Sequence, residues 1–207
     1  MNTLLVIAKA PVAGRVKTRL TTAFTPQQAA DLARASLRDT LDAVLATPAG
    51  RRVLVLDGQP GAWIPAGIEV VPQSSGGLDA RLAAAFALAG GPALLIGMDT
   101  PQVTPSLLAL GLDFTEADAW YGPAEDGGFW ALGLAEPDPA LLLGVPMSVP
   151  ETGKVQRRRL TDAGLAVQDL PELCDVDTPA DAQQVAAAAP GTRFAALYTG
   201  LCAVTSR

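Results

Sequence analysis

Short continuous apolar runs alternate along this chain with longer segments in which apolar and polar residues recur with a helical period. Apolar runs of this kind are typical of strands buried on both faces of a sheet, whereas amphipathic segments are typical of helices that cover it. The runs predict strands at Thr3–Ala8, Val53–Leu56, Ile68–Val71, Ala93–Met98, Ala119–Tyr121, Phe129–Leu134 and Ala166–Leu170. The amphipathic segments predict helices from Thr25 to about Ala46, over Leu78–Ala89, over Glu151–Ala163 and over Arg193–Arg207.

Three Thr-Pro pairs predict where helices begin. In Thr25-Pro26, Thr104-Pro105 and Thr178-Pro179 the threonine suits the capping position, and the proline suits the first helical residue, where its missing N–H costs nothing. Gln28 stands three residues after Thr25 and completes a capping box. The alternation of strands and helices then predicts an α/β fold, a three-layer αβα sandwich around a mostly parallel mixed sheet.

Composition bounds the size and the surroundings of this fold. With 207 residues, 49% of them apolar and 17% charged, the chain can bury a sizeable core, and we expect one domain over residues 1–207. The net charge of −6 argues against nonspecific binding to nucleic acid or to an anionic membrane. No apolar run approaches the roughly 20 residues that span a bilayer, and the first residues do not resemble a signal peptide. We therefore expect a soluble cytoplasmic protein.

The residue types that are missing exclude several kinds of catalysis. The chain has no histidine, which removes Ser-His-Asp and Cys-His mechanisms and histidine-ligated zinc. Its two cysteines, Cys174 and Cys202, are far apart and form no metal-binding pair. They are expected as reduced thiols, with a disulfide between them as the alternative.

A basic loop follows the first predicted strand. Residues 8–20, AKAPVAGRVKTRL, carry four cations and contain Gly14 and Pro11, which prevent a regular helix in the first part of the loop. Such a loop at the carboxyl end of a first strand is where α/β folds commonly hold phosphate, although a solvated surface is the alternative. The spacing is not that of a Walker A loop. The cations are Lys9, Arg15, Lys17 and Arg19.

Carboxylates are predicted at two other strand ends. Asp99 lies in GMDTP at residues 97–101, and Asp175 and Asp177 lie in DVDTP at residues 175–179. Since carboxyl ends of parallel strands share one edge of a sheet, these acids are expected to face the basic loop across a crevice. A divalent cation and a polyphosphate between them would explain the pattern, and Mg²⁺ or Mn²⁺ is the metal that suits oxygen ligands. The alternative is that each aspartate serves a turn or a cap.

Two glycine-containing loops complete the candidate site. The segment GPAEDGG at residues 122–128 places Asp126 where backbone can approach a ligand, or else forms a hairpin turn. The segment QSSGGLDARL, which begins at Gln73 and contains Gly77 and Arg81, either lies over a nucleobase or caps the following helix.

Four segments together carry a family resemblance: AKAPVAGRVKTRL, GMDTP, GPAEDGGFWALGL and DVDTP, in that order. From Leu4 to about Ala182 the chain resembles the nucleotide-diphospho-sugar transferase superfamily, with its GT-A glycosyltransferase-like fold. Within it, the chain is similar to the DUF2064 group, which is related to molybdenum-cofactor and 2-phospholactate guanylyltransferases. The nucleotide-side loop departs from the family pattern: Gly76 to Arg81 reads GGLDAR where Gly-Asp-Leu-Gly-Glu-Arg is usual.

The resemblance implies roles for the candidate residues. It implies an open mixed sheet with the donor nucleotide over its first half, and Arg15 and Lys17 at the donor phosphates. Asp99 occupies the position of the superfamily's metal-binding aspartate, and Asp177 that of the second metal carboxylate in the nucleotidyltransferase branch. Asp175 is the candidate third carboxylate. The loop that contains Asp126 would face the acceptor.

These roles define three hypotheses. In the first, a metal-dependent transferase moves a sugar from a nucleotide sugar to a small-molecule acceptor, with Lys17, Asp99, Asp126 and Asp177 as the catalytic set. In the second, the same site transfers a nucleotidyl group from an NTP to a small phosphorylated acceptor and releases pyrophosphate. In the third, the altered loop at 76–81 belongs to a nucleotide-binding module without catalysis.

Overall fold

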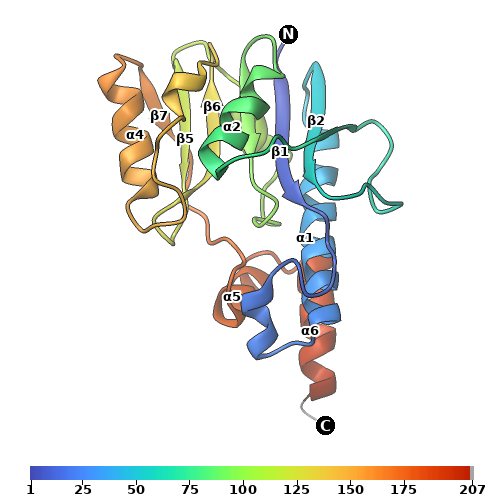
Figure 1. Ribbon diagram of the computed structural model, residues 1–207. Helices are drawn as coiled ribbons and strands as arrows, with labels where there is room; N and C mark the ends of the chain where they lie inside the picture. Colours follow the sequence, from blue (N-terminus) through green and yellow to red (C-terminus); the bar gives the residue numbers. More distant parts are fainter. Residues whose placement is uncertain (206–207) are drawn as a thin grey trace.

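The computed structural model describes residues 1–205, which form a seven-stranded sheet between helices (Figure 1). The strand order is β3-β2-β1-β4-β6-β5-β7. In the described residues, β6 runs antiparallel to both of its neighbours, and the other neighbouring pairs are parallel. The strands are β1 (Thr3–Lys9), β2 (Arg51–Asp57), β3 (Glu69–Pro72), β4 (Ala93–Ile96), β5 (Ala119–Pro123), β6 (Phe129–Leu134) and β7 (Val167–Asp169).

Helices cover both faces of the sheet because alternate strand residues point to opposite sides. Leu4 of β1 lies in one core with buried residues of α1 (Pro26–Ala46) and α3 (Pro105–Leu110). Its neighbour Leu5 lies in a second core with residues of α2 (Leu78–Ala87) and α4 (Thr152–Asp162). The predicted three-layer αβα fold with a mostly parallel sheet is therefore confirmed.

A third cluster of apolar side chains forms a smaller lobe beyond the carboxyl edge of the sheet (Figure 1). It packs the amino-terminal half of α1 against η1 (Thr18–Thr22), α5 (Pro179–Ala188) and α6 (Arg193–Thr205). The predicted closing helix is confirmed through residue 205, and residues 206–207 lie outside the described part. Cys174 and Cys202 both belong to this cluster and form no disulfide.

Helix starts agree with the Thr-Pro prediction. Thr25 accepts a hydrogen bond from Gln28 N at 3.2 Å while Gln28 Oε1 accepts from Thr25 N at 2.8 Å, which is the predicted capping box. Thr104 caps α3, and Thr178 caps α5 with its own capping box to Asp181. Two short 3₁₀ turns, η1 in the basic loop and η2 (Pro139–Leu141), were not predicted. Across residues 1–205, no helix combines the length and apolar character needed to cross a membrane.

Candidate functional site

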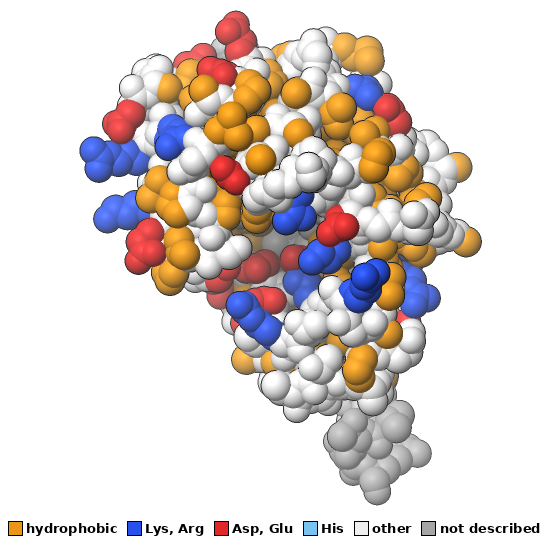
Figure 2. All heavy atoms as spheres, viewed as in Figure 1, with side chains coloured by type: hydrophobic (Ala, Val, Ile, Leu, Met, Phe, Trp, Pro, Cys, Tyr) orange, Lys and Arg blue, Asp and Glu red, His pale blue; other side chains and the backbone are white. Residues whose placement is uncertain are grey.

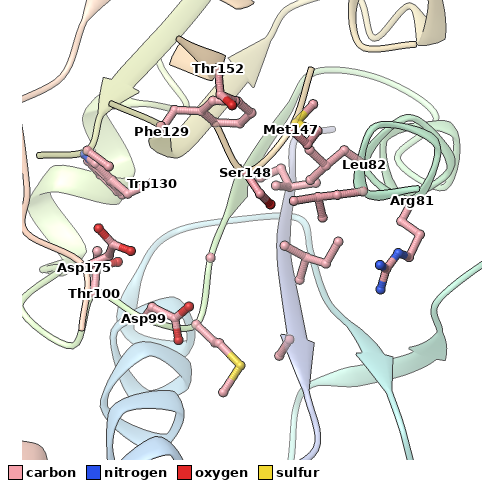
Figure 3. A pocket seen from close by; sticks show the side chains of 18 of the residues that line it. Arg81, Leu82, Asp99, Thr100, Phe129, Trp130, Met147, Ser148, Thr152 and Asp175 are labelled. Carbon is pink, nitrogen blue, oxygen red and sulfur yellow. The ribbon is translucent and has the colours of Figure 1, made fainter. Parts of the chain in front are cut away.

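A cleft of about 440 Å³ opens at the carboxyl edge of the parallel strands (Figure 3). Its lining comes from the ends of β1, β2 and β4, from α2, from the β5–β6 hairpin and from residues 147–152. A second hollow of about 250 Å³, lined by the basic loop, lies next to it, and the two share Lys9, Met98 and Asp99. Acidic and basic side chains meet at this hollowed face in Figure 2.

A single backbone contact brings the two acidic segments together. After β7 the chain passes beside the hairpin, where Leu173 pairs with Ala124, and then Val176 N donates to Asp99 O at 2.9 Å. Asp175 and Asp177 flank this contact on either side. As a result Asp175 lines the large cleft beside Asp99, whereas Asp177 lines the basic hollow.

The carboxylates in the large cleft are close enough to affect one another's ionisation. Burial raises the pKa of Asp175 to about 6, and the negative charges of Asp126 and Asp99 contribute in the same direction. Lys17 acts in the opposite direction. An additional cation at this position would therefore be electrostatically favoured.

The basic loop contacts the carboxylates directly. Lys17 Nζ lies 2.8 Å from Asp99 Oδ1, with the lysine side chain only 8% exposed, and Arg19 forms an ion pair with Asp177. Lys17 adopts a left-handed conformation with φ of 48°, so the backbone is bent where its side chain enters the site. The basic loop and the carboxylates therefore face each other as the sequence predicts, and two ion pairs join them.

The remaining loop residues are more open. Arg15 is exposed and lines the basic hollow together with Lys9, and neither makes an ion pair with a described residue. Gly14 has φ of +76° with open space around it, so it permits the turn that presents Arg15. These cations are available to an anionic ligand.

The donor atoms around Asp99 suit a hard cation. Asp99 Oδ1 is contacted by the Lys17 ammonium at 2.8 Å, and Thr100 Oγ1 is buried without a hydrogen-bond partner among the described residues. Asp99 and Asp175 line the same cleft, and Mg²⁺ commonly uses only one or two protein carboxylates, with water and phosphate oxygens completing its shell. Residues 1–205 contain no preassembled group of three acidic, histidine or cysteine ligands. Asp99 is engaged by Lys17 and Asp177 by Arg19, so a metal ion held by either residue would replace an ion pair. Asp99 and Asp175 are the two candidate ligands that share the large cleft, and Asp177 lies in the adjoining hollow.

Arg81 defines the opposite side of the large cleft, on α2 (Figure 3). Its Nη1 donates to Gln73 Oε1 at 3.2 Å and lies 3.8 Å from Asp57 Oδ2, while its buried Nε has no hydrogen-bond partner. Gln73 is itself fixed, because its amide donates to the carbonyls of Ala8 and Val55. Gly77 is the residue at which α2 begins, without a side-chain cap.

The β5–β6 hairpin presents Asp126 at the cleft and also uses it structurally. Asp126 Oδ1 accepts a hydrogen bond from Gly128 N at 2.8 Å, so this oxygen stabilises the hairpin turn. Tyr121 Oη donates to Gly128 O at 3.0 Å, and Gly153 N at the start of α4 donates to Gly127 O at 2.8 Å. The turn is thereby held between the sheet and α4 while Asp126 remains in the cleft lining.

Several lining residues were not singled out from the sequence. They are Thr100, Phe129, Trp130 and Thr152. Thr100, Phe129 and Trp130 lie within or directly after the motifs, so their proximity to Asp99 and Asp126 was the available signal. Met147 and Ser148 come from a segment whose approach to the cleft depends on how α4 packs.

Comparison with solved structures supports the fold. A protein from Desulfovibrio desulfuricans G20, described as a proposed nucleotide-diphospho-sugar transferase, is 25% identical with a TM-score of 0.88, and the match covers 98% of this chain and 95% of that one. The Rv0371c protein of Mycobacterium tuberculosis H37Rv, solved with manganese, is 22% identical with a TM-score of 0.53 and coverages of 89% and 96%. CMP:2-keto-3-deoxy-manno-octonic acid synthetase, solved with CTP, is 13% identical with a TM-score of 0.56 and the same coverages.

The sequence comparison gives a narrower assignment. No curated protein sequence matches the chain significantly. A family model described as an uncharacterized protein conserved in bacteria (DUF2064) matches residues 12–149, which include residues 12–20 of the basic loop, Asp99 and the β5–β6 hairpin. The chain therefore belongs to the DUF2064 family, and it has the nucleotide-diphospho-sugar transferase fold.

Proposed function

We propose that this protein is an enzyme that transfers a glycosyl group from a nucleotide sugar to a small-molecule acceptor. The observation that carries the proposal is the position of Asp99, where the basic hollow and the large cleft meet. A diphosphate bound at this junction would have Arg15, Lys9 and Lys17 on one side. The acceptor would enter from the other side, beside Asp126.

Each charged residue then has a distinct role. Lys9, Arg15 and Lys17 bind and orient the donor phosphates, and Lys17 exchanges its contact with Asp99 for a phosphate oxygen. Asp99 and Asp175 hold Mg²⁺ or Mn²⁺, which would neutralise the charge that develops on the leaving diphosphate. Asp177 holds Arg19 in place and is available as a further metal ligand if that ion pair opens. Asp126 orients the acceptor hydroxyl or accepts its proton.

The nucleotide side of the cleft lies between the basic loop and α2. Arg81 is fixed by Gln73 and keeps a buried Nε without a partner, so it can donate to a nucleotide at little cost in side-chain order. Gly77 allows the backbone at the start of α2 to approach that ligand. The manganese and the CTP named for the two distant structures support a metal ion and a nucleotide as ligands of proteins with this fold.

The test is metal-dependent binding of the donor. UDP-glucose, GDP-mannose and the corresponding nucleotides are titrated by calorimetry with Mg²⁺, with Mn²⁺ and with EDTA. We expect binding to require the metal and Asp99→Asn to weaken it by about 10²-fold or more, because the metal ion that neutralises the diphosphate loses a carboxylate ligand. Asp162→Asn is the matched control, since Asp162 lies on the exposed face of α4, outside the cleft, and pairs with Arg158. Unchanged metal-dependent binding in Asp99→Asn would exclude the assignment.

Nucleotidyl transfer is the second candidate, and the basic hollow favours it. Four cations line that hollow, which suits the triphosphate of an NTP. Pyrophosphate release is measured with each of the four NTPs and a panel of phosphorylated and unphosphorylated acceptors. Release with any NTP selects nucleotidyl transfer over glycosyl transfer, whereas nucleotide binding without any turnover supports a non-catalytic module.

A further inference from the structure

The two walls of the large cleft differ in charge. Its lining cations are Lys9 and Arg81, which come from the end of β1 and from α2. The facing wall comes from the β5–β6 hairpin, the start of β6 and residues 147–152, and contributes no lysine or arginine to the lining. Figure 3 shows Arg81 on one side of the cleft and Trp130 and Asp175 on the other. The wall without cations is lined by Asp126, Phe129, Trp130, Met147, Ser148, Val149 and Thr152.

Acidic groups make that wall unfavourable for anions. The charge of Asp126 acts on Asp175 strongly enough to contribute to its raised pKa, second to burial. On α4, Arg157 is engaged by both oxygens of Asp169 at 2.9 Å, and Lys154 does not line the cleft. A phosphomonoester at this wall would therefore meet the carboxylate of Asp126 without a lysine or arginine from the same wall, because the lining cations Lys9 and Arg81 come from β1 and α2.

The same wall offers a partly apolar surface. Phe129 and Met147 are half-buried and line the cleft, and the Phe129 ring packs at a tilt against Tyr121 with ring centroids 6.1 Å apart. The hydrogen bond from Tyr121 to the Gly128 carbonyl fixes this arrangement. Such a surface suits the C–H face of a sugar ring or another apolar part of a ligand.

Hydroxyl groups supply neutral hydrogen-bonding partners. Thr100 is 1% exposed, lines the cleft, and has an Oγ1 without any partner, which is costly unless a ligand satisfies it. Ser148 has φ of 61°, a conformation that L residues rarely adopt, and it also lines the cleft. The backbone around Ser148 is held by Thr152, whose hydroxyl donates to Pro146 O at 2.8 Å and accepts from Val149 N at 3.2 Å.

We propose that the acceptor is an uncharged hydroxyl compound whose apolar face lies on Phe129 and Met147 and whose hydroxyls bind Thr100 and Ser148. Phosphorylated acceptors are excluded from this wall by the charge of Asp126. The inference rests on the proposed function, because only in a transferase is this ligand an acceptor. The binding site itself is defined by the charge and shape of the cleft.

Methionine resonances report on the two sides of the site separately. The chain has three methionines: Met147 lies on the proposed acceptor wall, Met98 lines both hollows, and Met1 is 87% exposed. Protein labelled with ¹³C at the methionine methyl groups is titrated with glycerol, glucose and myo-inositol and with the phosphomonoester of each. Met147→Leu assigns the resonance.

We expect at least one neutral probe to shift Met147 at a concentration about ten-fold or more below that of its phosphomonoester. Inorganic phosphate should shift Met98 and leave Met147 unchanged. A phosphomonoester that shifts Met147 at a lower concentration than its parent alcohol overturns the proposal, as does a panel in which no neutral probe shifts Met147.

A charge variant tests the reason for the preference. Asp126→Asn keeps an oxygen that can accept from Gly128 N, so the turn is retained while the charge is removed. We expect the ratio between phosphomonoester and neutral probe to fall several-fold, mainly through tighter binding of the phosphomonoester. Glu136→Gln, an exposed change of the same kind outside the cleft lining, should leave the ratio unchanged. An unchanged ratio in Asp126→Asn contradicts the proposal.

These titrations contain no nucleotide, so their outcome is separate from that of the proposed function. Failure of nucleotide and Mg²⁺ to shift Met98 would remove the donor site and the transferase assignment. Failure at Met147 alone would remove only the acceptor class.

Discussion

The contact between α4 and the β5–β6 hairpin allows a prediction whose magnitude follows from the structure. At Gly153 an added Cβ would overlap the hydroxyl of Tyr121 and would lie 2.5 Å from Gly128 O and 2.8 Å from Gly127 O. Real Cβ atoms essentially never approach other atoms below 3.0 Å, and two of these three neighbours are backbone. Gly153→Ala must therefore move α4 away from the hairpin.

The cost is the sum of three effects. Overpacking typically costs about 1–3 kcal/mol. Two hydrogen bonds, Gly153 N to Gly127 O and Tyr121 Oη to Gly128 O, would be stretched, at up to about 1 kcal/mol each. The greater helix propensity of alanine returns less than about 1 kcal/mol. We expect a net loss of about 2–4 kcal/mol, which lowers Tm by about 5–15 °C in a domain of this size.

Gly200→Ala is the matched control, because Gly200 lies within α6 and an added Cβ there meets nothing within 4 Å. It should raise the free energy of unfolding by about 0.5–1 kcal/mol. Both variants are measured by urea unfolding with comparable m-values and by thermal melting. If Gly153→Ala is as stable as Gly200→Ala, the close approach of α4 to the hairpin is not a feature of the folded protein, and the placement of Asp126 beside α4 loses its support.

Two other regions give further predictions. Burial raises the pKa of Asp175 to about 6, and the charge of Asp126 is the next contribution. Because the folded protein holds this proton more tightly than the unfolded chain, the protonated carboxyl contributes fully to the free energy of unfolding below about pH 4, and this contribution is lost as the pH rises through 6. In urea unfolding with EDTA, the free energy of unfolding of Asp175→Asn relative to that of the wild type should rise by about 1 kcal/mol between pH 5 and 7.5. A difference between the two proteins that does not change with pH would contradict this. Asp39, whose side chain is 8% exposed, accepts from Phe194 N at 2.9 Å, so Asp39→Ala should cost about 2 kcal/mol and speed amide exchange in α6. Arg158→Ala, which breaks an exposed ion pair, should change stability by less than about 0.5 kcal/mol, and equal effects of the two would refute the docking role of Asp39.

Local pattern was sufficient for the elements of this fold. The apolar runs predicted β6 with its observed bounds and the other strands within about two residues. The physical reason holds for the central strands such as β1, β4 and β6, because strands buried on both faces need continuous apolar sequence, whereas β3 and β7 are mostly exposed. Thr25, Thr104 and Thr178 identified three helix starts, since a capping side chain and its proline act within a few residues of each other. The 3₁₀ turn η1 was missed because its residues carry no apolar period, and its one buried residue, Leu20, belongs to the lobe with α5 and α6.

The candidate site was predicted in its residues and only partly in its geometry. The rule that parallel strands share a carboxyl edge was enough to bring Asp99, Asp175 and the basic loop to one place. It could not separate Asp175 from Asp177, which the Val176–Asp99 hydrogen bond directs into different hollows. It also did not predict that Lys17 and Arg19 would contact carboxylates directly.

The sequence by itself determined which segments become strands and helices, and which charged residues follow the strands, because these properties depend on near neighbours in the chain. The tertiary structure decided which side chains share a cleft. Met147 and Ser148 reach the site because their segment is held on both sides, to α2 by the hydrogen bond from Gly144 N to Asp79 Oδ2 and to α4 by the hydroxyl of Thr152. Arg81 reaches the same cleft because α2 covers this face of the sheet. The contact between Gly144 and Asp79 joins residues that lie tens of positions apart, and it is set by the packing of whole elements rather than by any local pattern.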